Sequence, residues 1–188
     1  FDQVRKEGGS AVVLTISSRL SGTYQSACLA AADYENIFVV DTQTAAIGSG
    51  ILAEYALLQA GSFSSAEALA AHLEEKRQDI CLLGLLDTLE YLKRGGRISK
   101  TAAMAGGLLN IKPVVTIQNG EVALVGKARG SRQGNNLLAE MIRQSGGIDF
   151  TLPILLGYTG LSDAVLDKYV QDSRSLWQDY GKEPERTT

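Results

Sequence analysis

The sequence predicts an α/β protein in which part of a parallel α/β layer is followed by a smaller α+β domain. Two observations predict this order. Strand and helix patterns alternate over residues 1–78, which is typical of a parallel sheet with right-handed helical crossovers. Later, two apolar strand patterns flank Asn119-Gly120, the strongest kind of short signal for an antiparallel hairpin. We therefore expect domains at 1–78 and 79–175 and a polar tail at 176–188.

The elements of the first domain follow from short β-branched runs and from apolar residues at helical spacing. The helix expected at residues 45–60 carries almost no charge, so we expect it to be deeply packed. Ser21 is a suitable N-cap for the helix before it, and Ser64 with Glu67 forms a capping box for the helix after it. The expected strands are 12–16 and 37–40, and the expected helices are 22–34, 45–60 and 64–78.

The second domain begins with an apolar strand and continues with helices on both sides of the hairpin. Asp87 and Glu90 form a capping box, and Gly95 with Gly96 ends the helix that they begin. Ser99 can cap another helix. We expect strands at 80–86, 111–117, 121–127 and 153–158, and helices after Asp87, at 99–107, at 131–144 and at 163–172.

Composition indicates an ordinary soluble protein. The chain has 188 residues, of which 45% are apolar, and a net charge of −3, which suits a packed core. No uninterrupted apolar run approaches the roughly 20 residues that span a bilayer, and the polar first residues do not form a signal peptide. Cys28 and Cys81 lack the spacing of a disulfide framework or a metal site. We therefore expect two buried thiols in a cytoplasmic protein without a cofactor.

A run of hydroxyl residues, Ser17-Ser18-Arg19-Leu20-Ser21-Gly22-Thr23, lies between the first strand and the first helix. Ligands of open α/β sheets bind beyond the carboxyl ends of the strands. A helix N-terminus there offers unpaired N–H groups and partial positive charge to an anion, and Gly22 allows close approach. The run would suit a carboxylate and a phosphate about equally. An ordinary serine-rich helix cap would explain the same residues.

A second polar turn, Asp41-Thr42-Gln43-Thr44, follows the next strand. If the two strands are parallel, both turns lie on the same edge of the sheet. The turn would also serve as a simple N-cap, so its nearness to the hydroxyl run is what makes it a candidate.

Positive charge is concentrated between residues 91 and 139. Eight bases and one acid, Glu121, leave this stretch at +7, so the rest of the chain totals −10. Such segregation indicates an anionic ligand or a partner surface. Arg97 and Arg129 suit bidentate contact with phosphate or carboxylate, whereas Lys93 and Arg94 compensate the dipole of the helix that they end. The eight bases are Lys93, Arg94, Arg97, Lys100, Lys112, Lys127, Arg129 and Arg132.

Several other kinds of site lack support. The chain has no P-loop and no G-x-G-x-x-G sequence. Nucleic-acid binding is disfavoured, because no aromatic residue is interleaved with the basic residues after Tyr91. The one histidine, His72, is expected on a solvated helix. A Ser-His-Asp triad and a zinc site are therefore unsupported.

Four motifs, in this order and at this spacing, resemble the DegV family. The first is ISSRLSGTYQSA at 16–27, and the second is LDTLEYLKRGGRIS at 86–99. The third and fourth are LNIKP at 109–113 and KARG at 127–130. The order of strands and helices extends the resemblance to roughly residues 1–170.

The resemblance implies the two-domain EDD fold of that family, with a long-chain fatty acid held between or within the domains. It implies a carrier rather than an enzyme. Some members are the acyl-carrying subunit of a bacterial fatty acid kinase, whose partner subunit supplies ATP. Carried over, Arg97 and Arg129 would face the partner or the acyl phosphate, and the fatty-acid carboxylate would be surrounded by Ser17, Ser18, Ser21, Gly22 and Thr23.

The chain departs from the family in three places. It starts without methionine, and it lacks the N-terminal segment that carries another Thr/Ser-rich loop in the family. We therefore expect an N-terminally truncated chain. The last C-terminal segment of the family is missing, and Tyr158 stands where the family tends to have a histidine. Two other functions stay open. One is an enzyme or binding protein for a small phosphorylated substrate clamped by Arg97 and Arg129, and the other is a scaffold or interaction module.

Overall fold

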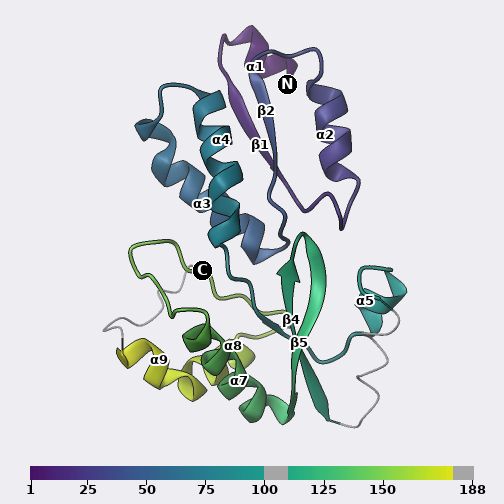
Figure 1. The fold of residues 1–188 in the computed structure, drawn as a ribbon, viewed down its shortest axis with the longest axis vertical. Helices are drawn as coiled ribbons and strands as arrows, with labels where there is room; N and C mark the ends of the chain where they lie inside the picture. Colours follow the sequence, from purple (N-terminus) through teal and green to yellow (C-terminus); the bar gives the residue numbers. More distant parts are fainter. Residues whose placement is uncertain (100–109, 180–188) are drawn as a thin grey trace. The chain divides into compact units, whose positions relative to one another are not determined.

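The computed structural model describes residues 1–99 and 110–179, and the chain divides into two compact units (Figure 1). Unit 1 consists of Phe1–Leu82 together with Ile117–Glu121, and unit 2 consists of Leu83–Thr116 and Val122–Thr188. A parallel sheet and an antiparallel sheet are both present, which confirms the α/β fold class expected from the sequence. The domain boundaries suggested by the sequence stay a prediction.

Unit 1 is built on a two-stranded parallel sheet. β1 (Ala11–Thr15) and β2 (Ile37–Asp41) pair from Ala11 beside Ile37 to Thr15 beside Asp41. The crossover helix α2 (Thr23–Ala31) lies on one side of the strands, while α3 (Ile47–Gln59) and α4 (Ala66–Lys76) lie on the other (Figure 1). The short elements are α1 (Asp2–Lys6), η1 (Ala60–Ser62) and η2 (Arg77–Asp79).

The core of unit 1 lies between the sheet and the pair of helices α3 and α4. Val40 of β2, Leu52 of α3 and Leu73 of α4 are buried together, and Val12 and Leu14 of β1 pack against them. These β-branched and leucine side chains remove apolar surface from water, at about 25 cal/mol per Å². Both strands are therefore packed on one core up to their carboxyl ends.

The helix expected to be deeply packed buries only one stripe. In α3, Gly48 and Leu52 are buried, whereas Leu57 and Leu58 are 79% and 67% exposed. A helix that covers one face of a sheet needs one apolar stripe only, so its low charge did not indicate deep burial.

Two expectations about single residues in unit 1 are wrong. His72 is half-buried rather than solvated, because its ring packs against Tyr55 and Phe63 and its Nε2 lies 2.9 Å from the Tyr55 hydroxyl. The two thiols are not both buried, since Cys28 is half-buried and Cys81 is exposed, with neither in a disulfide.

Unit 2 contains an antiparallel sheet in the order β3-β4-β5. The strands are β3 (Gly84–Leu85), β4 (Ile111–Gln118) and β5 (Glu121–Arg129). Asn119 and Gly120 have φ angles of 51° and 81°, as a two-residue hairpin turn requires, so the expected hairpin is confirmed. The helices are α5 (Glu90–Arg94), α7 (Gly130–Gln144), α8 (Ala164–Asp172) and α9 (Arg174–Asp179).

The other two expected strands of the second domain are largely absent. Of residues 80–86 only Gly84 and Leu85 are in a strand, and residues 153–158 are irregular. Ile154 and Leu156 instead pack against the cluster around Trp177. Their apolar pattern therefore reflects core packing without sheet pairing.

The chain after α8 is not a polar tail from residue 176 onward. Leu176 and Trp177 lie in α9 and are 0% and 2% exposed, packed with Ala139 of α7. The expected helix at 99–107, the base Lys100 and residues 180–188 lie outside the described residues. None of the helices in the described part of the chain has the length and apolar character of a membrane span.

Candidate functional site

The two polar turns lie side by side at one edge of the parallel sheet, as the sequence predicted for parallel strands. The register sets Thr15 beside Asp41, so both turns leave the sheet at the same point. Two hydrogen bonds connect them. The N–H of Ser17 donates to the carbonyl of Thr44 at 2.9 Å, and the N–H of Ser18 donates to Asp41 Oδ1 at 3.1 Å.

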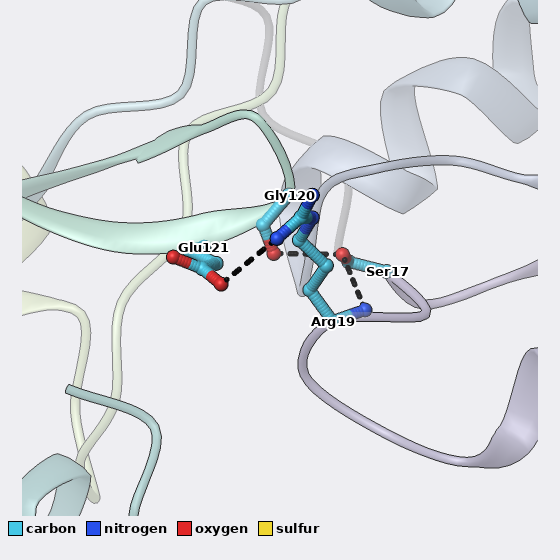
Figure 2. A network of polar contacts seen from close by, with 4 residues as sticks. All are labelled: Ser17, Arg19, Gly120 and Glu121. Carbon is cyan, nitrogen blue, oxygen red and sulfur yellow. Dashed lines mark hydrogen bonds and ion pairs between the residues drawn. The ribbon is translucent and has the colours of Figure 1, made fainter.

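We call residues 17–23 the serine loop, and Ser17 is its buried end. Ser17 is 0% exposed, and its hydroxyl donates to the carbonyl of Gly120 at 2.7 Å while accepting from the N–H of Arg19 at 3.3 Å (Figure 2). Its own carbonyl accepts from the N–H groups of Leu20 at 3.0 Å and Ser21 at 3.1 Å. One buried serine therefore closes the turn and bonds it to the hairpin tip.

The other end of the serine loop is open to solvent. Gly22 and Thr23 are exposed, and Ser18 and Ser21 are half-buried. Gly22 is the N-cap of α2, without a side-chain cap bond. Ser21 Oγ lies 2.7 Å from Thr23 Oγ1 and accepts from the N–H of Thr23 at 3.3 Å. Hydroxyls and the positive end of a helix dipole thus meet at an accessible point.

The hairpin tip, Ile117–Glu121, belongs to unit 1 and contacts the serine loop twice. Besides the bond from Ser17 to Gly120, Arg19 Nη1 lies 3.3 Å from Glu121 Oε1 (Figure 2). Both side chains of this ion pair are mostly exposed, at 62% and 63%. Glu121 was noted in the sequence only as the one acid in a basic stretch.

The turn after β2 is a buried network of hydroxyl groups. Thr42 Oγ1 lies 3.0 Å from Ser49 Oγ and accepts from the N–H of Thr44 at 3.4 Å. Thr44 Oγ1 is buried without a hydrogen-bond partner among the described residues. Arg77 Nη1 donates to the carbonyl of Asp41 at 2.5 Å. This turn acts as the base on which the serine loop rests.

A tyrosine of α2 stands next to the serine loop. Tyr24 has a raised pKa, first because of its hydrogen bond with the Cys28 thiol, then because of burial and the nearby Glu74 and Asp41. The shift favours the protonated, neutral form of the Tyr24 hydroxyl.

The two arginines expected to meet a partner are both exposed, on different elements of unit 2. Arg97 follows α5, and its Nη1 donates to the carbonyl of Gly95. Arg129 ends β5, and its N–H donates to Gln133 Oε1 at 3.1 Å. Lys93 and Arg94 lie in the last turn of α5, as dipole compensation requires. The roles of Arg97 and Arg129 stay predictions.

Sequence reasoning missed the residues that support the serine loop from other segments. Gly120 was recognised as a turn residue, yet its partner Ser17 lies 103 positions away. Arg77 follows α4 and belongs to no recognisable sequence motif. The described residues contain no cluster of His, Cys, Asp or Glu suited to a metal ion.

A family model described as uncharacterised proteins of the DegV family matches residues 1–182. The chain belongs to the DegV family. A DegV domain-containing protein of Caldanaerobacter subterraneus is 33% identical over 152 residues, which cover 80% of this chain and 54% of that protein. This DegV-family chain spans about half the length of the curated relatives that it matches.

Two solved structures of relatives are described in connection with fatty acids. A DegV family protein from Thermus thermophilus, described by its fatty acid binding, is 38% identical with a TM-score of 0.68, over 77% of this chain and 52% of that one. The fatty acid kinase B3 protein of Streptococcus pneumoniae, solved with linoleic acid, is 28% identical with a TM-score of 0.68, over 78% of this chain and 55% of that one.

Proposed function

We propose that this DegV-family protein binds a long-chain fatty acid and holds its carboxylate at the serine loop. The observation that carries the proposal is the likeness to the Thermus thermophilus structure, which is described by fatty acid binding and is 38% identical over 77% of this chain. The residues proposed to surround the head group are Ser17, Ser18, Ser21, Gly22 and Thr23.

The chemistry of the serine loop supports a carboxylate. A buried charge needs hydrogen-bond donors, because an unpaired one is costly. The accessible end of the loop has the hydroxyls of Ser21 and Thr23, 2.7 Å apart, at the N-terminus of the nine-residue helix α2. Partial positive charge there adds typically 0.3–1 kcal/mol for an anion. The acyl tail would contribute about 0.8 kcal/mol for each methylene that it buries.

We propose further that the bound acyl group is presented to a kinase subunit that supplies ATP. The likeness to the B3 protein of a fatty acid kinase supports this role. Arg97 and Arg129 are the proposed contacts with that partner or with the acyl phosphate, since guanidinium groups bind phosphate in a bidentate manner. Chemistry on the phosphate would then belong to the partner, and this chain would act as the carrier.

A thermal-shift titration with oleate and stearate tests the proposal. A ligand that binds only the folded state raises the melting temperature, so both fatty acids should raise it in a concentration-dependent manner. Hexadecane and glucose 6-phosphate are the controls, one without a head group and one without a tail. A shift with glucose 6-phosphate alone would instead support the phosphorylated-substrate function. No shift with any fatty acid would refute the proposal for this chain.

Two variants of the serine loop and one control variant test where the head group binds. Ser21→Ala and Thr23→Ala should each reduce the shift, whereas Ser26→Ala, on an exposed position of α2, should leave it unchanged. An equal response of all three variants would place the carboxylate elsewhere.

A further inference from the structure

We infer that the hairpin tip positions the serine loop for its anion, with Gly120 and Glu121 as the positioning residues and Ser17 as the group through which they act. The inference rests on the proposed function for the identity of the anion. It divides the serine loop into a buried supporting end and an accessible binding end.

The Ser17 hydroxyl has a single proton to donate. That proton is donated to the Gly120 carbonyl at 2.7 Å, which leaves the oxygen to accept from the N–H of Arg19 at 3.3 Å. A hydroxyl has one donor and two acceptor positions. Because Ser17 is 0% exposed and its donor is used, it supports the loop, and the ligand is left to Ser18, Ser21 and Thr23.

Gly120 of the hairpin tip lies close against the serine loop. A Cβ atom at position 120 would lie 2.6 Å from Ser17 Oγ and 3.4 Å from Arg19 Cδ. The φ angle of 81° at Gly120 also disfavours any side chain. Glycine is therefore required twice, once by the turn and once by the close approach to Ser17.

An ion pair also links the hairpin tip to the serine loop. Arg19 is the only ionised side chain within the serine loop, and it pairs with Glu121 at 3.3 Å. Exposed pairs of this kind contribute little to stability, but they restrict where a flexible guanidinium can lie. The pair keeps Arg19 on the tip side of the loop.

Thermodynamic reciprocity turns this arrangement into a test. If docking of the tip favours anion binding, then anion binding must favour docking of the tip by the same factor. Fatty acid should therefore slow amide exchange at the tip. The competing arrangement, in which Ser17 gives its proton to the carboxylate, leaves the Gly120 carbonyl without a donor and should speed that exchange.

The experiment is amide hydrogen exchange on the 188-residue chain, first without ligand. Gly120→Ala and Glu121→Gln change only the tip, so faster exchange at Arg19, Leu20 and Ser21 is expected if the tip positions the loop. Gly8→Ala is the control for Gly120→Ala, because Gly8 has a φ angle of 67° and nothing within 4 Å of its Cβ position. Glu35→Gln, on an exposed site, is the control for charge loss. Unchanged loop exchange in both tip variants would overturn the inference.

The second arm adds oleate. Slower exchange at residues 119–121 of the wild-type chain is expected. The affinity for oleate should fall about fivefold in Gly120→Ala, the scale of one hydrogen bond, and stay unchanged in Gly8→Ala. Faster exchange at the tip would overturn the positioning role and assign the Ser17 proton to the ligand. A wild-type chain that binds no oleate would refute the proposed function, while the ligand-free arm would still decide whether the tip positions the loop.

Discussion

The carboxylate of Asp41 accepts a hydrogen bond from the backbone N–H of Ser18 at 3.1 Å, so the end of β2 holds the loop that follows β1. The same Oδ1 atom accepts from the N–H of Gln43 at 3.0 Å, and Asp41 is 8% exposed. Two backbone donors stabilise a buried carboxylate. Its negative charge also opposes a second anion at the serine loop.

Replacing Asp41 by asparagine separates these two effects. D41N keeps an oxygen acceptor for Ser18 but loses the charge. We therefore expect the free energy of unfolding to fall by about 1–2 kcal/mol. Fatty acid should bind at least as tightly as in the wild type. D41A loses the acceptor as well and should be less stable than D41N. Denaturant titration and oleate titration measure both effects. Weaker oleate binding in D41N with unchanged stability would contradict this account.

The turn after β2 offers a contrast between two threonines. Thr44 Oγ1 is buried without a partner among the described residues, whereas Thr42 Oγ1 bonds to Ser49 at 3.0 Å. Removing an unsatisfied hydroxyl is neutral or stabilising, while removing a satisfied one costs about 1–2 kcal/mol. We therefore expect T44V to match or exceed the wild type in free energy of unfolding, and T42V to fall below it. A greater loss in T44V than in T42V would show that the Thr44 hydroxyl has a ligand or water as its partner.

Local patterns predicted the elements well where the signal is short-range. The β-branched runs located β1 and β2, and Asn119-Gly120 located the turn between β4 and β5, because positive φ at both positions demands such residues. The nearness of the two polar turns also followed from sequence, since parallel strands end on the same edge.

Long-range relationships could not be predicted in this way. No local pattern indicates that Ser17 bonds to Gly120 or that Arg77 bonds to Asp41. These partners lie 103 and 36 positions apart in the sequence, so the fold as a whole brings them together. The irregular segment at 153–158 shows the opposite error, since an apolar run is compatible with a strand and with core packing. In the structure this run packs against the cluster around Trp177, so core packing explains its apolar pattern.

The pH dependence of stability should carry a contribution from Asp172. Its pKa is lowered, first by the hydrogen bond from Lys168 and next by the one from Asn135, whose Nδ2 lies 2.8 Å from Oδ2. A group with a lowered folded pKa stabilises the fold above its unfolded pKa, and the stabilisation is lost as pH falls through the folded value. The wild type should exceed D172N by roughly 1 kcal/mol at pH 7, and the difference should shrink below about pH 4.

Asp33→Asn, at an exposed position of unit 1, is the control for this comparison. Denaturant unfolding of the wild type and both variants at pH 7, 5 and 3 would measure the differences. If the difference in free energy of unfolding between the wild type and D172N stays constant over this range, packing rather than the charge on Asp172 causes it.

The buried end of α9 should be essential for the stability of unit 2. Trp177 is 2% exposed, its ring meets that of Phe150 edge to face at 6.1 Å, and its Nε1–H donates to Ser173 Oγ at 3.0 Å. We expect W177A to lose about 3–5 kcal/mol, the usual cost of removing a buried large aromatic. W177F keeps most of the packing but loses the donor, so it should lose less. Leu161→Ala, at a fully exposed position, should leave the unfolding free energy within about 0.5 kcal/mol of the wild type. Chemical unfolding followed by far-UV circular dichroism would rank the three variants, and a W177A chain as stable as L161A would show that α9 does not pack on α7 in solution.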